Sequence, residues 1–254
     1  MPSDPLQTIS FTHFTTADGL PNNTVRAIHE VTQGAVWFGT GDGLVRYDGY
    51  RFVTYKHDQD DPTSISNNHI RDLFFDAEGA LWIGSANGGV SRFDATTETF
   101  TNFRRNLNDD NSLADNIVYA IAQDENGRFY FGGPPETGLN VYDPETETFT
   151  RYRSNEDFVG SAIQQMVADE QGNVWIATNS SVSRFENDQF FHYPIPAEEQ
   201  ATVALLRDDN GRLWVGGNAG LLAYASSADQ LAAVPGRPTR ITALIQDRDG
   251  MLWV

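Results

Sequence analysis

The side chains that could bind a metal or transfer protons are five histidines and 35 Asp and Glu residues. The histidines show neither i, i+4 nor H-x-H spacing: His13, His29, His57, His69 and His192. There is no G-x-S-x-G turn and no phosphate-binding loop. The chain has no cysteine, which excludes thiolate metal sites and thiol catalysis. Oxygen-rich turns such as residues 124–127 lack the spacing and final Glu of a calcium-binding EF-hand loop. We therefore expect no catalytic residue, no metal and no cofactor.

Binding chemistry is easier to see than catalysis. Alignment on a recurring Gly-x-x-Trp pattern places six residues at one equivalent position: Arg26, Arg71, Tyr119, Gln164, Val203 and Thr242. A guanidinium can bind a carboxylate or sugar hydroxyls through two hydrogen bonds. In a chain of net charge −18, a local cationic site attracts anionic ligands. All of these residues except Val203 are therefore predicted to bind a ligand. The alternative is that they form the solvated wall of a channel.

The pattern that aligns these residues is an internal repeat. A glycine precedes an aromatic residue by three positions in six places, at intervals of 39 to 48 residues. The aromatic residues are Trp37, Trp82, Tyr130, Trp175, Trp214 and Trp253. No tryptophan lies outside this position. These residues are expected to be structural and to pack between repeats, since burial of so large an apolar side chain is strongly favourable.

Each repeat predicts four short strands. A β-branched or aromatic segment leads into a turn that contains Asn-Gly or Asp-Gly, which supplies the positive φ of a tight hairpin. The aromatic residue lies on the second strand, a motif such as GLVRYD (43–48) forms the third, and an aromatic pair such as Phe52/Tyr55 marks the fourth. Four antiparallel strands in roughly 43 residues are typical of a β-propeller blade. The predicted fold class is therefore all-β, a propeller of four-stranded blades.

The repeat also sets the expected blade boundaries. The chain is predicted to be a partial propeller of five full blades and part of a sixth: 20–57, 65–104, 113–153, 160–194, 201–230 and 239–254. Residues 7–15 are predicted to form an orphan outer strand, since Phe11-Thr12-His13-Phe14 resembles a fourth strand. The parent ring is expected to have seven blades, with six as the alternative.

In such a blade, the connections between the second and third strands lie on the same face as the inter-blade loops. Loops on a rigid scaffold commonly carry function. The ligand position described above is expected near this face, at the start of the innermost strand. Five loop residues are predicted to surround it: Asp42, Asn87, Glu136, Asn179 and Asn218.

Composition restricts the partners. With 17 Lys and Arg against 35 Asp and Glu, the chain does not resemble a nucleic-acid binder. The same charge opposes docking to an anionic membrane surface. No apolar run is long enough to cross a bilayer, and no signal peptide is visible.

The motif D-x-x-G-x-[LV]-W-[IV]-G-[TS], followed by G-[LV]-x-R-[YF]-D, resembles the two-component regulator propeller repeat. The opening ADGLPNNTV (17–25) and the loops DDPTSISNNHI (60–70) and DDNSLADNIV (109–118) are also similar to that family. The resemblance implies the extracytoplasmic, periplasmic sensor half of a membrane receptor. In that family a histidine kinase or a diguanylate cyclase often follows. Departures are Val31 in place of the turn Asp, and Ala177 in place of Gly.

The resemblance favours a non-catalytic domain that senses a small molecule or an oligosaccharide, with a homodimer formed through the parent receptor. Two alternatives remain open. One is an enzyme similar to the propeller lyases that open cyclic peptide antibiotics, which would need a His/Glu and metal set on the channel face. The other is an interaction or dimerisation scaffold without a small ligand.

Overall fold

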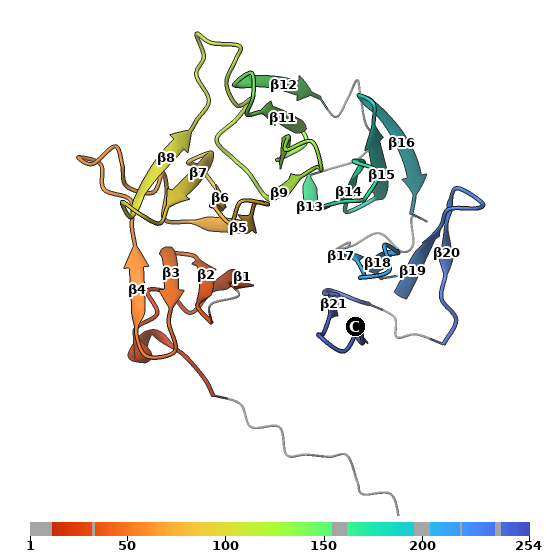
Figure 1. Cartoon of the computed structure of the whole chain (residues 1–254), viewed down its shortest axis with the longest axis horizontal. Coiled ribbons are helices and arrows are strands. Elements are labelled where there is room, and N and C mark those ends of the chain that lie inside the picture. The colour runs from red at the N-terminus through yellow and green to blue at the C-terminus, as the bar shows by residue number, and fades with distance from the viewer. Residues whose placement is uncertain (1–11, 32–33, 154–161, 196–203, 219, 237–239) are drawn as a thin grey trace, which may run out of the picture.

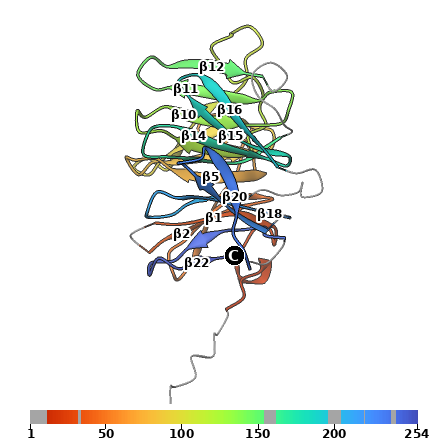
Figure 2. The same cartoon turned by 90° about the vertical axis from the view of Figure 1, so that its right-hand side faces the viewer.

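The computed structural model describes residues 12–31, 34–153, 162–195, 204–218, 220–236 and 240–254. Within this part of the chain, five four-stranded antiparallel sheets and one two-stranded sheet follow one another around a ring (Figures 1 and 2). The first strand of each sheet faces the centre of the ring and the last strand lies on the outside (Figure 1). The predicted all-β propeller of five full blades and part of a sixth is confirmed.

The blades are numbered in chain order. A short 3₁₀ helix, η1 (Thr16–Asp18), precedes them. Blade 1 comprises β1 (Val25–Glu30), β2 (Val36–Thr40), β3 (Gly43–Tyr47) and β4 (Phe52–Tyr55). Blade 2 comprises β5 (Ile70–Phe75), β6 (Leu81–Ser85), β7 (Val90–Asp94) and β8 (Thr99–Phe103). Blade 3 comprises β9 (Ala120–Gln123), β10 (Phe129–Gly132), β11 (Leu139–Asp143) and β12 (Thr148–Tyr152). Blade 4 comprises β13 (Ile163–Ala168), β14 (Val174–Thr178), β15 (Ser181–Glu186) and β16 (Gln189–Pro194). Blade 5 comprises β17 (Ala204–Arg207), β18 (Leu213–Gly217), β19 (Gly220–Ala225) and β20 (Gln230–Ala233), and blade 6 comprises β21 (Ile245–Gln246) and β22 (Leu252–Trp253).

The turn between the first two strands of a blade is built around an aspartate and a glycine. In blade 2, Gly79 has a φ of 84°, a conformation that favours glycine. Asp76 accepts hydrogen bonds through Oδ1 from the backbone N–H groups of Glu78 and Ala80. Its other oxygen accepts the indole N–H of Trp82 at 2.8 Å. The carboxylate therefore fixes the turn and the buried aromatic residue together. The same bond joins the turn Asp to the aromatic side chain in blades 3 to 6.

Each aromatic residue of blades 1 to 5 also has a guanidinium over its ring. Where the third strand carries an arginine, as at Arg92 opposite Trp82, that residue supplies it. In blade 3 the paired position is Val141, and Arg128, directly before the second strand, takes its place with Cζ 5.7 Å from the Tyr130 ring centroid. Blade 5 repeats this exchange, with Arg212 over the ring of Trp214. Cation–π contacts thus recur with the repeat.

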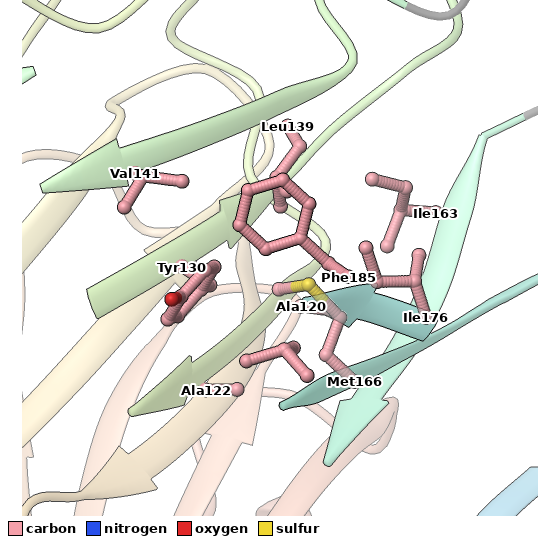
Figure 3. Close-up of a cluster of buried hydrophobic side chains, with 10 residues drawn as sticks. Ala120, Ala122, Tyr130, Leu139, Val141, Ile163, Met166, Ile176 and Phe185 are labelled. Carbon is pink, nitrogen blue, oxygen red and sulfur yellow. The ribbon is translucent and has the colours of Figure 1, made fainter. Parts of the chain in front are cut away.

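Apolar side chains between neighbouring blades form the core. Figure 3 shows one such cluster, in which Tyr130 of blade 3 and Phe185 of blade 4 are fully buried among aliphatic side chains. The blades approach closely where a glycine ends the second strand. A Cβ atom on Gly132 would lie 2.4 Å from Cγ2 of Ile163 in the next blade. This contact explains the glycine that follows Trp-[IV] in the repeat.

Two predicted boundaries differ from the structure. Residues 12–15 form no strand, and Phe14 packs its ring against Tyr47 and Phe52 of blade 1; residues 7–11 lie outside the described part. Blade 5 continues to Ala233 rather than ending at residue 230. Its last strand lacks the aromatic pair by which the other last strands were recognised. No helix within the described residues is long and apolar enough to cross a membrane.

Candidate functional site

In blades 1, 2 and 4, the aligned position at the start of the first strand is a β-bulge. In blade 1, Val25 pairs with Thr40 and Ala27 pairs with Gly39, so Arg26 is an extra residue in its strand. Arg71 in blade 2 and Gln164 in blade 4 are extra residues in the same way. In blade 3, Tyr119 donates its N–H to Gly132 O, one residue before the first pair of the strand. A bulge redirects a side chain out of the sheet, and the repeat does this at an equivalent place in these blades.

The bulges lie at the face where the inter-blade loops meet the turns between second and third strands. In blade 1, Gly43 N–H donates to Asn68 O at 2.7 Å, which joins that turn to the loop that leads into blade 2. Gly89 N–H donates to Asn116 O one junction further on. The predicted arrangement of these two sets of loops on one face is therefore correct.

Across blades 1 to 3, this face holds a cationic group, which we call the mouth cluster: Arg26, His69, Arg71 and Tyr119. Arg71 lies over the ring of Tyr119, with Cζ 5.1 Å from the ring centroid. Burial, and then the positive charges of Arg71 and Arg26, hold the pKa of His69 below its usual value. The imidazole is therefore neutral at pH 7 and lies within electrostatic reach of both guanidiniums.

The mouth cluster has unused hydrogen-bonding capacity. Among the described residues, no ion pair includes Arg26 or Arg71, although nine other basic residues form one. Nε of Arg71 and Nε2 of His69 are buried and have no hydrogen-bond partner in this part of the chain. Unpaired buried donors and adjacent like charges are both unfavourable. An anion with several oxygens would relieve both.

The other predicted residues do not join this cluster. Gln164 is exposed and donates to Ala162 O within its own blade. Thr242 is exposed and precedes the short strand β21, and Val203 lies outside the described residues. Sequence reasoning identified the two arginines but assigned no role to His69, although it stands two residues before Arg71.

The five predicted loop residues lie in the connections between second and third strands. Asn87, Glu136, Asn179 and Asn218 are exposed. Asp42 is half-exposed and forms an ion pair with Lys56 at 2.6 Å. They have the placement expected of residues around the mouth, but no contact in the structure assigns them to a ligand.

Deeper in the ring, the first strands of blades 2, 3 and 4 line a channel of about 420 Å³. The residues that follow two of the bulges link neighbouring blades there. Asp72 accepts the N–H of Ile121 at 2.8 Å, and Gln165 both donates to and accepts from the backbone of Leu205. Burial raises the pKa of Asp72 to about 6, despite the two N–H groups that it accepts. The described residues contain no cluster of three or more potential metal ligands.

The repeat units match a known family. The sequence profile of the two component regulator propeller matches five segments: residues 19–42, 64–87, 112–134, 157–180 and 197–219. The chain contains repeats of the two-component regulator propeller family. A curated relative, histidine kinase P4 of Formosa agariphila, is 43% identical over 56 residues, which cover 22% of this chain and 4% of that protein.

Solved structures similar to this propeller show the same fold. The extracellular domain of BT3049 from B. thetaiotaomicron, classed as a hybrid two-component system, has a TM-score of 0.82 at 23% identity, over 95% of this chain and 33% of that one. Virginiamycin B lyase from Staphylococcus aureus has a TM-score of 0.69 at 14% identity, over 91% and 76% of the two chains. The propeller thus spans about a third of the first structure and a small part of the curated relative. At these identities the two solved structures support the fold alone.

Proposed function

We propose that this propeller is a non-catalytic ligand-sensing domain of a bacterial signal-transduction receptor, located outside the cytoplasm in the periplasm. The ligand is a small molecule or oligosaccharide rich in oxygen atoms, a carbohydrate with a carboxylate or many hydroxyl groups. The family match and the relation to a histidine kinase support the receptor context.

The observation that carries the proposal is the mouth cluster. Two arginines that have no carboxylate partner among the described residues lie beside a neutral imidazole on the loop-bearing face of a chain with net charge −18. Arg184, by contrast, forms an ion pair with Asp229 at 3.1 Å. Arg26 and Arg71 instead present their donors at the face where ligands commonly bind on a rigid scaffold.

Isothermal titration of the chain against a panel of neutral and acidic oligosaccharides tests the proposal. Arg71→Ala should weaken binding by about 1.5–3 kcal/mol, the range for hydrogen bonds to charged groups, or about 10- to 150-fold in Kd. Arg105→Ala, which removes an exposed arginine outside the cluster, serves as the matched control and should bind as wild type does.

Two outcomes would contradict the site. The first is a double Arg26→Ala/Arg71→Ala variant that binds an identified ligand with unchanged affinity. The second is a large fall in the melting temperature of that variant, which would show that the arginines serve the fold. Turnover of any panel member by the wild-type chain would contradict the non-catalytic assignment.

A further inference from the structure

Blade 1 departs from the other blades at the turn before its tryptophan. In blades 2 to 6, an aspartate on this turn accepts the N–H or O–H of the aromatic side chain at 2.7–2.9 Å. Blade 1 has Val31 at the equivalent position. Among the described residues, the indole N–H of Trp37 has no hydrogen-bond partner, whereas the other four indoles all have one.

The backbone hydrogen bonds that Val31 makes are nevertheless the same as those of the turn aspartate. Val31 N–H donates to Ala35 O and Gly34 N–H donates to Val31 O, both at 2.9 Å. The corresponding bonds in blade 2, made by Asp76 and Gly79, are both 3.0 Å. Residue 31 therefore holds its side chain where the aspartate would be, but its methyl groups end one bond short of the place of the carboxylate oxygens.

A cleft of about 1050 Å³ opens at this place, between blades 1 and 2 on the face opposite the mouth cluster. Val31, Ala35 and Trp37 line one side, and Phe75 and Phe93 of blade 2 line the other. At three other junctions, a polar residue before the turn Asp bridges to the preceding blade, as Gln123 does to Ala77 N–H; between blades 3 and 4 the residue is Ala168. The corresponding residue here is Phe75, which packs on the His29 ring at 4.7 Å. An aromatic contact thus replaces the bridge, and the cleft is left open.

Two guanidiniums complete the lining. Arg46 comes from blade 1 and Arg92 from blade 2. The only carboxylate within ion-pair distance of Arg92 among the described residues is Glu78, at 3.9 Å, and the side chain of Glu78 is 84% exposed. Arg46 pairs with Glu98 at 3.1 Å and lies over the Trp37 ring.

The acidic residues of the cleft have other partners. Asp48 accepts the N–H groups of Tyr50 and Arg51, and Asp94 accepts that of Thr96. Glu30 pairs with Arg248 of blade 6. None of them replaces the missing aspartate at the Trp37 indole.

We infer that this cleft binds the carboxylate of a small organic acid with an apolar or aromatic body, and that the carboxylate takes the place of the turn aspartate that blade 1 lacks. One oxygen accepts the indole N–H of Trp37, the Arg46 guanidinium over the same ring supplies the opposite charge, and the body lies against Phe75. The site is independent of the mouth cluster and of the function proposed for it.

A single substitution at residue 31 can introduce a carboxylate that competes with the ligand. Val31→Asp should place a carboxylate on the Trp37 indole, as in the other blades, and so occupy the site from within. Val31→Thr keeps the β-branched shape without a carboxylate and is the matched control.

The readout is the ¹H–¹⁵N spectrum of the indole N–H groups, in which Trp37→Phe identifies the Trp37 signal by its loss. Titration with 3-phenylpropionate should shift the Trp37 signal in the wild type and in Val31→Thr, and leave the other four indole signals in place. Val31→Asp should shift the Trp37 signal without ligand and weaken 3-phenylpropionate binding about tenfold or more, equivalent to about 1.4 kcal/mol or more. Arg46→Gln should weaken it in the same direction, and Arg105→Ala, which removes an exposed arginine outside both sites, should leave it unchanged.

Three results would overturn the inference. The Trp37 signal does not move with millimolar 3-phenylpropionate, the Val31→Asp variant binds as the wild type does, or the neutral 3-phenylpropanamide binds equally well. The four other indole signals report whether each variant is folded, so a loss of binding through unfolding is recognised directly.

Discussion

Replacement of Asp76 by alanine should destabilise the propeller far more than loss of an ordinary turn residue. The carboxylate accepts three N–H groups: the Trp82 indole at 2.8 Å, Glu78 at 3.1 Å and Ala80 at 2.7 Å. Trp82 is buried, so its N–H loses its only partner. A hydrogen bond to a charged group contributes about 1.5–3 kcal/mol. The two backbone N–H groups of the turn can form hydrogen bonds with water instead, so the loss of each bond adds only roughly 0.5 kcal/mol to the destabilisation. The expected loss is therefore about 2.5–4 kcal/mol.

Urea denaturation followed by circular dichroism measures this loss, provided that the slopes of wild type and variant agree. Asp94→Ala is the matched control, because Asp94 also accepts two turn N–H groups, from Thr96 and Thr97, but no indole. It should cost about 1 kcal/mol or less. Equal destabilisation by the two variants would refute the reasoning, since the indole bond would then contribute nothing.

Three further changes have defined outcomes. The pKa of His69 lies below its usual value, so the imidazole becomes positively charged only when the pH falls below that pKa. The affinity of the mouth cluster for an anion should therefore rise as the pH falls. Titrations at several pH values measure this rise, and His69→Gln should remove it. The pKa of Asp72 is raised to about 6, so between about pH 4 and pH 6 its carboxyl holds a proton in the native state but not in the unfolded state. The free energy of unfolding should therefore fall as the pH rises through this range. Asp72→Asn still accepts the Ile121 N–H and should abolish this pH dependence in urea titrations. Gly132→Ala should lower stability by about 1–3 kcal/mol in the same assay, because its Cβ would meet Ile163, whereas Gly49→Ala, which has open space around the Cβ and carries only the strain of its own positive φ of 91°, should leave the core signal of near-UV circular dichroism intact.

The sequence predicted the repeat units well because their signals are local. Turn glycines with positive φ, such as Gly127 and Gly211, stand beside strands whose apolar residues face a core. The last strand of blade 5 was placed short because Leu231 and its neighbours lack the aromatic pair. The strand nevertheless forms, since its hydrogen bonds to β19 involve the backbone alone.

The candidate site was only partly predictable. Alignment placed Arg26 and Arg71 at one position, but a bulge depends on the register between two strands, which alternation along a single strand does not reveal. The bond from Asp76 to the Trp82 indole joins residues six apart and needs the hairpin geometry to be recognised. The role of Val31 can be inferred only once that bond is known, because the bond shows that the aspartate missing from blade 1 would have accepted the indole N–H of Trp37.

In blades 1, 2 and 4, the bulge at the start of the first strand separates the side chains that the ring displays from those that hold it together. Arg26, Arg71 and Gln164 are each the extra residue of their strand, so their side chains are not required for the pairing on either side. Substitution at these positions therefore changes the chemistry of one blade while its neighbours and its sheet stay intact. A propeller built in this way can acquire a new ligand by single amino-acid changes, one blade at a time, and a designer can rewrite its specificity without repacking the core.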